Sequence, residues 1–188
     1  NFLDCDGDQD LDLVVGSTSG TIYYFEQVSK GVYEARTNAS DNPFYGINSG
    51  RKSAMSFVDI TGDDALDMVL TNYDGEFFLY ANTGSNVNPS YTLQKGRGVN
   101  PFLSISGNKR EEFGKGTFLD VDGDDKQDLI FVSINPERIH FYRHLSSSQK
   151  INFKSQDDPS TNPFSADVLR IRRSRSAPFI SDIDGDGD

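Results

Sequence analysis

Four Asp-rich loops recur along the chain, and they constrain its fold more than any other feature. They occupy residues 4–12, 59–67, 120–128 and 182–188. Each begins with Asp and has Gly at its fourth position, and acidic side chains recur at positions 1, 3, 5 and 9. Like charges packed this closely repel one another unless a cation neutralises them. Calcium, which takes about six to eight oxygen ligands, suits this pattern best.

The acidity of the chain is concentrated in these loops. The 188 residues include 29 Asp and Glu against 18 Lys and Arg, which gives a net charge of −11. The loops hold 18 of the acidic residues and a single Lys, so the rest of the sequence is slightly basic. The low pI therefore reflects the loops and predicts neither a basic nor a nucleic-acid partner.

Other bulk features narrow the class of protein. The single cysteine, Cys5, excludes an internal disulfide framework and a Cys-based zinc site. No apolar run reaches the length of a membrane span, so we expect none. The chain begins at Asn1 without a leader-like segment and stops inside the fourth loop. We expect residues 1–188 to be a fragment of a longer repetitive protein.

A second marker runs in step with the loops. The tripeptide Asn-Pro-Phe occurs at residues 42–44, 100–102 and 162–164. Each complete loop is followed by a short apolar run, a turn and an aromatic segment, a pattern typical of β-strands, and no stretch shows helical periodicity. Each repeat has room for about four strands, which predicts all-β propeller blades. The expected repeats are approximately 1–56, 57–117 and 118–179, with 180–188 the start of a further one.

The repeats resemble the FG-GAP/VCBS family, which builds β-propellers such as the integrin α-subunit head. The resemblance lies in the Asp-rich loops, in the Phe-x-Asp at 57–59 and 118–120 that opens two of them, and in the apolar run at 11–16. It implies a propeller fragment with blades of about four antiparallel strands and calcium loops in β-hairpins.

The loop pattern identifies candidate calcium ligands. Positions 1, 3, 5 and 9 would supply side-chain oxygens and position 7 a backbone carbonyl, whereas positions 2, 8 and 10 are mostly apolar and would point into the blade. Three loops are complete, the fourth is truncated, and Thr61 replaces one carboxylate. The candidates are Asp4, Asp6, Asp8, Asp10, Asp12, Asp59, Thr61, Asp63, Ala65, Asp67, Asp120, Asp122, Asp124, Lys126, Asp128, Asp182, Asp184, Asp186 and Asp188.

Other residues carry weaker signals. Four arginines between 170 and 175 could contact an anion, but a solvated or edge-protecting strand is the better interpretation. His140 and His144 lie on a strand-like segment and lack a zinc or catalytic motif. Cys5 is expected to be a small buried hydrophobe. Asn38 begins a glycosylation sequon, which makes a glycoprotein possible.

These observations and the resemblance predict a non-enzymatic, calcium-stabilised module for adhesion, scaffolding or protein interaction. An extracellular or cell-surface location follows from the abundance of calcium outside cells, which fills even weak sites. The partners would be other proteins or glycans, and further blades could come from missing sequence or another chain. Two alternatives stay open: a carbohydrate-binding, lectin-like propeller, and an accessory domain of a larger enzyme.

Overall fold

The computed structural model describes residues 1–96, 98–105, 116–134, 137–145, 151–156, 158 and 160–164. In these residues the chain forms three four-stranded antiparallel sheets and one short 3-10 helix, η1 (Pro101–Ser104). The predicted all-β class is thereby confirmed. The fourth Asp-rich loop, residues 182–188, and the arginines at 170–175 lie outside the described residues.

Each sheet is a meander in which strands pair in chain order. The first sheet contains β1 (Phe2–Leu3), β2 (Asp12–Gly16), β3 (Ile22–Ser29) and β4 (Val32–Arg36). The second contains β5 (Ala54–Val58), β6 (Asp67–Thr71), β7 (Phe77–Asn82) and β8 (Tyr91–Leu93). The third contains β9 (Thr117–Leu119), β10 (Asp128–Ile134), β11 (Glu137–His144) and β12 (Phe153–Ser155). Each complete Asp-rich loop joins the first two strands of a sheet, as expected for a hairpin connection.

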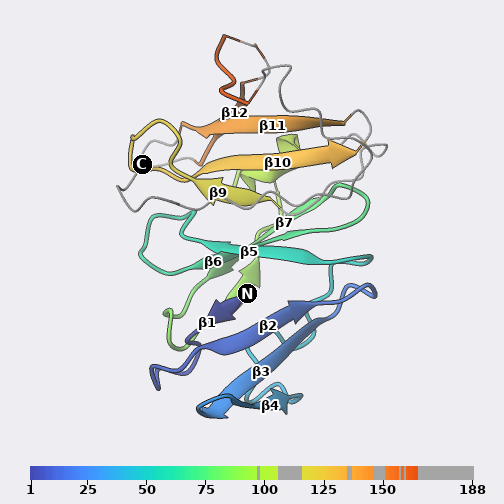
Figure 1. Ribbon diagram of the computed structural model, residues 1–188, viewed down its shortest axis with the longest axis vertical. Helices are drawn as coiled ribbons and strands as arrows, with labels where there is room; N and C mark the ends of the chain where they lie inside the picture. Colours follow the sequence, from blue (N-terminus) through green and yellow to red (C-terminus); the bar gives the residue numbers. More distant parts are fainter. Residues whose placement is uncertain are drawn as a thin grey trace.

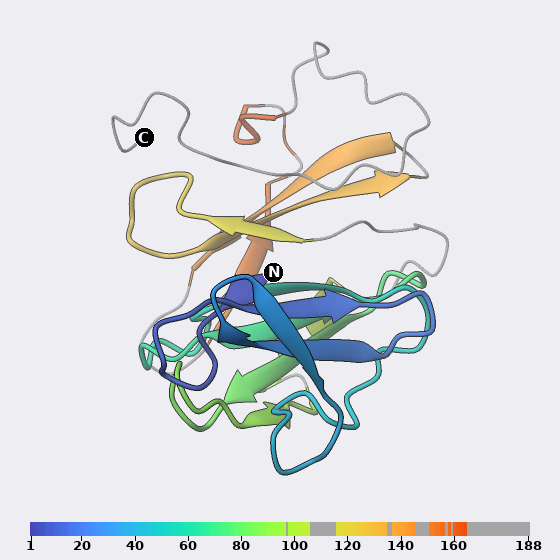
Figure 2. The ribbon, with the colours of Figure 1, turned by 60° about the horizontal axis from the view of Figure 1, so that its bottom comes forward.

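The three sheets follow one another along the longest axis of the molecule (Figure 1), with β5–β8 between β1–β4 and β9–β12. In the turned view of Figure 2 the first sheet lies in front of the second, and the third sheet stands above both. Two separate clusters of buried side chains fill the spaces between neighbouring sheets. The arrangement is that of consecutive blades, each packed on the next.

The middle sheet contributes buried side chains to both clusters, because the side chains of its strands alternate between its two faces. Successive side chains of a strand point to opposite faces. Met68 and Leu70 of β6 join the cluster shared with the first sheet, and Val69 between them joins the cluster shared with the third. All five residues of β6 are buried, because this strand has a neighbouring sheet on each side.

The Asn-Pro-Phe tripeptides place a phenylalanine between consecutive sheets. Phe44 contacts Tyr24 of its own sheet and Phe57 of the next, with ring centroids 5.8 and 5.9 Å apart. Phe102 repeats this between Phe77 and Phe118, at 5.7 and 6.0 Å.

The asparagine of each tripeptide fixes this turn. Its side-chain oxygen accepts the backbone N–H of the phenylalanine two residues later, at 2.8, 3.0 and 2.9 Å, and all three asparagines are buried. Phe164, the third member, contacts Phe141 of its own sheet at 5.9 Å. The tripeptide is therefore a structural wedge.

Burial corrects one detail of the sequence interpretation. Cys5 is buried, as expected for position 2 of its loop, and so is Ile60. Leu11 at position 8 was expected to point into the blade, but it is 53% exposed. The first sheet resumes only at Asp12, so Leu11 still belongs to the loop. No helix in the described part of the chain is long and apolar enough to cross a membrane.

Candidate metal centre

The three described Asp-rich loops share one backbone conformation. The glycine at position 4 and the residue at position 6 both have positive φ, a region that glycine tolerates and that costs most other residues energy. The angles are 83° and 73° for Gly7 and Gln9, 78° and 67° for Gly62 and Asp64, and 73° and 63° for Gly123 and Asp125. The shared conformation turns each loop back on its own first residue.

The carboxylate at position 1 organises this turn. Asp4 accepts the backbone N–H groups of Gly7 at 2.7 Å and Gln9 at 3.2 Å. Asp59 and Asp120 accept the equivalent N–H groups in their loops, and also that of position 5, at 2.6 to 3.3 Å. Position 1 therefore holds the loop closed whether or not it also binds an ion.

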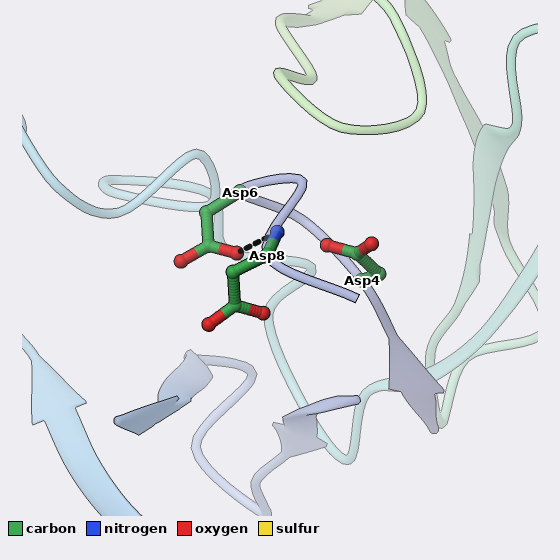
Figure 3. Close-up of side chains that lie close together, drawn as sticks. All are labelled: Asp4, Asp6 and Asp8. Carbon is green, nitrogen blue, oxygen red and sulfur yellow. Dashed lines mark hydrogen bonds between the residues drawn. The ribbon is translucent and has the colours of Figure 1, made fainter. Parts of the chain in front are cut away.

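In the first loop, three carboxylates converge. Asp4, Asp6 and Asp8 each offer an oxygen, and these oxygens all lie within 4.8 Å of one another. Figure 3 shows the carboxylates of Asp6 and Asp8 side by side, with that of Asp4 directed towards them; the dashed line is the 3.2 Å bond from the Asp8 N–H to Asp6 Oδ1. Asp120, Asp122 and Asp124 form the same cluster in the third loop.

The aspartate at position 9 lies apart from the carboxylates at positions 1, 3 and 5. Asp12, Asp67 and Asp128 are completely buried at the start of β2, β6 and β10. Asp67 Oδ2 accepts the N–H groups of Ile60 at 3.0 Å and Thr61 at 2.9 Å, and its Oδ1 accepts that of Asn82 at 2.8 Å. This carboxylate ties the loop to the end of the third strand.

The other two position 9 aspartates repeat this arrangement. Asp12 accepts the N–H groups of Cys5 at 3.0 Å and Gln27 at 2.9 Å, and Asp128 accepts those of Val121 at 3.2 Å and His144 at 2.7 Å. We call these three residues the brace aspartates. Both oxygens of each brace carboxylate accept a backbone N–H, and none of the three residues belongs to the clusters formed by positions 1, 3 and 5.

The second loop brings fewer ligands together. Thr61 is exposed and donates its backbone N–H to Asp67, and Ala65 at position 7 is buried. Asp63 Oδ1 accepts the Ala65 N–H at 3.1 Å, as Asp8 accepts that of Asp10 and Asp124 that of Lys126. Within the described residues no cluster of three acidic ligands forms in this loop.

The local charges differ between the first and third loops. Burial raises the pKa of Asp6, and the charges of Asp8, Asp12 and Glu26 raise it further. A hydrogen bond from Lys126 lowers the pKa of Asp124, and the charges of Lys126 and Arg143 add to this effect. The first loop therefore has an excess of negative charge, whereas the third has basic neighbours.

The first loop fits a calcium ion. Calcium lies about 2.3–2.6 Å from its oxygens, so two oxygens on one ion are at most about 5 Å apart. The Asp4, Asp6 and Asp8 oxygens meet this limit. Hard carboxylate oxygens are the donors that calcium prefers, and backbone carbonyls or water would complete its shell. Calcium bound there would supply the positive charge that the loop lacks.

Sequence reasoning missed two residues that shape these loops. Asn86, in the turn between β7 and β8, accepts the Leu66 N–H at 2.7 Å and donates to the Asp64 carbonyl at 2.9 Å. The Tyr24 hydroxyl donates to Asp12 at 2.8 Å. A strand pairing would have to be known before either contact could be expected, because each spans 12 or more residues.

The two histidines are part of the packing. His140 is stacked on Phe131 with centroids 4.6 Å apart, and His144 on Phe153 at 4.7 Å. Both are buried. Across the described ranges neither joins a group of three potential metal ligands.

Comparison with known families agrees with the loop geometry. Residues 4–70 match a family described as FG-GAP-like repeat. This segment contains the first Asp-rich loop, the first Asn-Pro-Phe tripeptide, and the second loop with most of β6. A comparison with curated proteins gives no match. The match and the three blade-like sheets describe a β-propeller-like module, and residues 4–70 are identified as an FG-GAP-like repeat.

Proposed function

We propose that this chain is a non-enzymatic, calcium-stabilised interaction module that works outside the cell. The observation that carries the proposal is the convergence of Asp4, Asp6 and Asp8 within 4.8 Å. No ion pair in the described part of the chain neutralises these carboxylates. A divalent cation would remove their mutual repulsion and hold the hairpin between β1 and β2 in one conformation.

A structural role for the loop accounts for its repetition. The same hairpin connection recurs in each sheet, and its brace aspartate ties it to the sheet. A catalytic site would require a particular group of residues at one place, whereas this pattern repeats one arrangement. The FG-GAP-like repeat at residues 4–70 also supports a propeller-like interaction module rather than an enzyme.

The proposed partners are other proteins. A glycan-binding function would be favoured by exposed aromatic side chains at equivalent positions of every repeat. The large exposed aromatics among the described residues are Phe2, Tyr23, Tyr33 and Tyr45, and all belong to the first repeat. Nothing here favours the lectin-like alternative, and binding to a glycan array without binding to extracellular proteins would support it.

Thermal unfolding in millimolar calcium and in excess EGTA tests the calcium proposal. Calcium should raise the melting temperature of the wild-type chain, and Asp6→Asn should remove most of that gain. Asp41→Asn is the matched control, because Asp41 is exposed and also accepts a backbone N–H, at 3.1 Å from Asn38. Identical melting with and without calcium would contradict the proposal.

The affinity tests the proposed location. Extracellular modules bind calcium with dissociation constants on the order of 10⁻⁴–10⁻³ M. Calorimetry should give a value in this range for the first loop. A submicromolar value would remove the argument for an extracellular setting, because such a site would also fill inside cells.

A further inference from the structure

The Asp-rich loops differ at one strand position that faces them. In the third strand of each sheet, one residue donates its backbone N–H to the brace aspartate. The residue immediately before this donor is Glu26 in β3, Ala81 in β7 and Arg143 in β11. Strand pairing places the three at equivalent points, because Phe25, Tyr80 and Tyr142 before them pair with Leu13, Met68 and Leu129. The same position thus carries a negative, a neutral and a positive side chain.

The charge at position 7 of the loop varies in the same order as the charge at this strand position. It is Asp10 in the first loop, Ala65 in the second and Lys126 in the third. Both variable positions are acidic in the first repeat and both are basic in the third. Glu26 is itself paired with Arg36 at 2.8 Å, so the first repeat brings no basic side chain to its loop from either position.

In the third loop both basic side chains reach the acidic cluster. The Arg143 guanidinium lies against the Asp122 carboxylate through Nε, and its Nη2 is 3.8 Å from Asp124 Oδ2. Lys126 Nζ is 3.1 Å from the same Asp124 oxygen. Together they bring two positive charges, the charge of one divalent ion, to two of the three carboxylates that would bind it.

We propose that Arg143 and Lys126 take the place of calcium in the third loop. Both are tethered beside the cluster, so their effective concentration there is high. An incoming ion would have to displace them from Asp122 and Asp124. The third loop should therefore bind calcium at least tenfold more weakly than the first. This inference rests on the proposed function only for its comparison with the first loop.

Counting calcium sites by calorimetry tests the proposal on the whole chain. Asp122→Asn should leave the number of sites unchanged, whereas Asp6→Asn should remove one. The double variant Lys126→Ala, Arg143→Ala installs the residues found in the second repeat, and it should gain one site that Asp122→Asn then abolishes. Lys30→Ala, which removes an exposed lysine from the turn between β3 and β4, is the charge control and should gain none.

Each result decides between the proposals. Loss of a site in Asp122→Asn alone, or no gain in a folded double variant, would overturn the third-loop proposal. If the double variant fails to fold, Glu26→Arg provides a second test, because it places a basic side chain beside the first loop. This variant should lose the calcium site of the first loop, whereas Glu26→Gln should keep it. Retention of the site in Glu26→Arg would count against the proposal. A wild-type chain that binds no calcium would contradict the proposed function, while a new Asp122-dependent site in the double variant would still support this inference.

Discussion

The Tyr24 hydroxyl donates a 2.8 Å hydrogen bond to Oδ2 of Asp12, and both residues are buried. The bond links β3 to the first residue of β2, where the first Asp-rich loop ends. A carboxylate buried this deeply requires donors, since an ion in an apolar environment is otherwise very costly. Tyr24 thus contributes to the stability of the loop from within the core.

Tyr24→Phe should therefore lower the free energy of unfolding by about 1–3 kcal/mol, because it removes a donor from a buried charge. Tyr23→Phe is the control, since Tyr23 is the adjacent residue and is 50% exposed. Its effect should stay within about 0.5 kcal/mol. Urea unfolding of both variants in EGTA measures the difference, and equal effects would show that the Tyr24 bond contributes little.

The brace aspartates predict a second effect, which does not depend on metal. Asp67→Asn replaces one carboxylate oxygen by an NH₂ group that faces backbone N–H donors, and it should cost about 1–3 kcal/mol. Asp64→Asn makes the same chemical change at an exposed position of the same loop and should be nearly neutral. Both are measured in EGTA; a loss for Asp67→Asn that appears only with calcium would contradict a brace role.

A third prediction concerns Phe44 and Phe102, the phenylalanines of the Asn-Pro-Phe tripeptides that lie between consecutive sheets. Phe102 is fully buried between the second and third sheets. Phe102→Ala leaves a cavity and should lower the free energy of unfolding by about 3–5 kcal/mol. Phe2→Ala removes a phenylalanine that is 57% exposed and should change the stability far less. Chemical denaturation measures both, and similar losses would mean that Phe102 does not hold the two sheets together.

Much of this fold could be predicted because its signals are local. The Asp-rich loops and the apolar runs after them mark the first hairpin of each sheet, and the regular spacing predicts consecutive blades. The position of the brace aspartates was also open to prediction. Asp12 lies two residues before Val14, so strand alternation places both on the buried face. The loop pattern also groups Asp12 with the ligands at positions 1, 3 and 5, and that assignment stays a prediction.

The remainder depends on contacts between distant residues. Arg143 lies 21 residues beyond Asp122 in the sequence, and only the pairing of β10 with β11 shows that it faces the loop. The Asn-Pro-Phe tripeptide was visible as a marker, but its wedge role requires the sheet that follows. Leu11 was placed wrongly because a loop position was treated as part of the strand.

A fourth prediction concerns acid stability. Arg36 donates two 2.8 Å hydrogen bonds to the Glu26 carboxylate, which lower the pKa of Glu26 below its ordinary value. A lowered pKa stabilises the folded protein above the ordinary pKa of Glu, about 4.5, and this contribution is lost as the pH falls through the lowered value. Glu26→Gln should therefore destabilise the chain at pH 7 and have a diminishing effect below about pH 4.5.

Urea midpoints at several pH values measure that trend. Glu34→Gln is the control, because Glu34 also contacts Arg36 but its side chain is 58% exposed. It should produce a smaller loss at pH 7. A penalty for Glu26→Gln that stays constant from pH 7 to pH 3 would contradict the role of the ion pair.

A fifth prediction concerns the acidic cluster of the first loop: the effect of Asp8→Asn on the melting temperature should change sign when calcium is added. Asp8→Asn removes one of three converging charges but keeps the Oδ1 that accepts the Asp10 N–H at 2.8 Å. In EGTA this relieves repulsion, so the melting temperature should rise slightly. In millimolar calcium the same change removes a ligand, so the melting temperature should fall. A change of about 1 kcal/mol corresponds to roughly 2–4 °C in a chain of this size. Asp41→Asn should have the same small effect in both conditions, and an Asp8→Asn shift of one sign throughout would mean that these carboxylates do not share an ion.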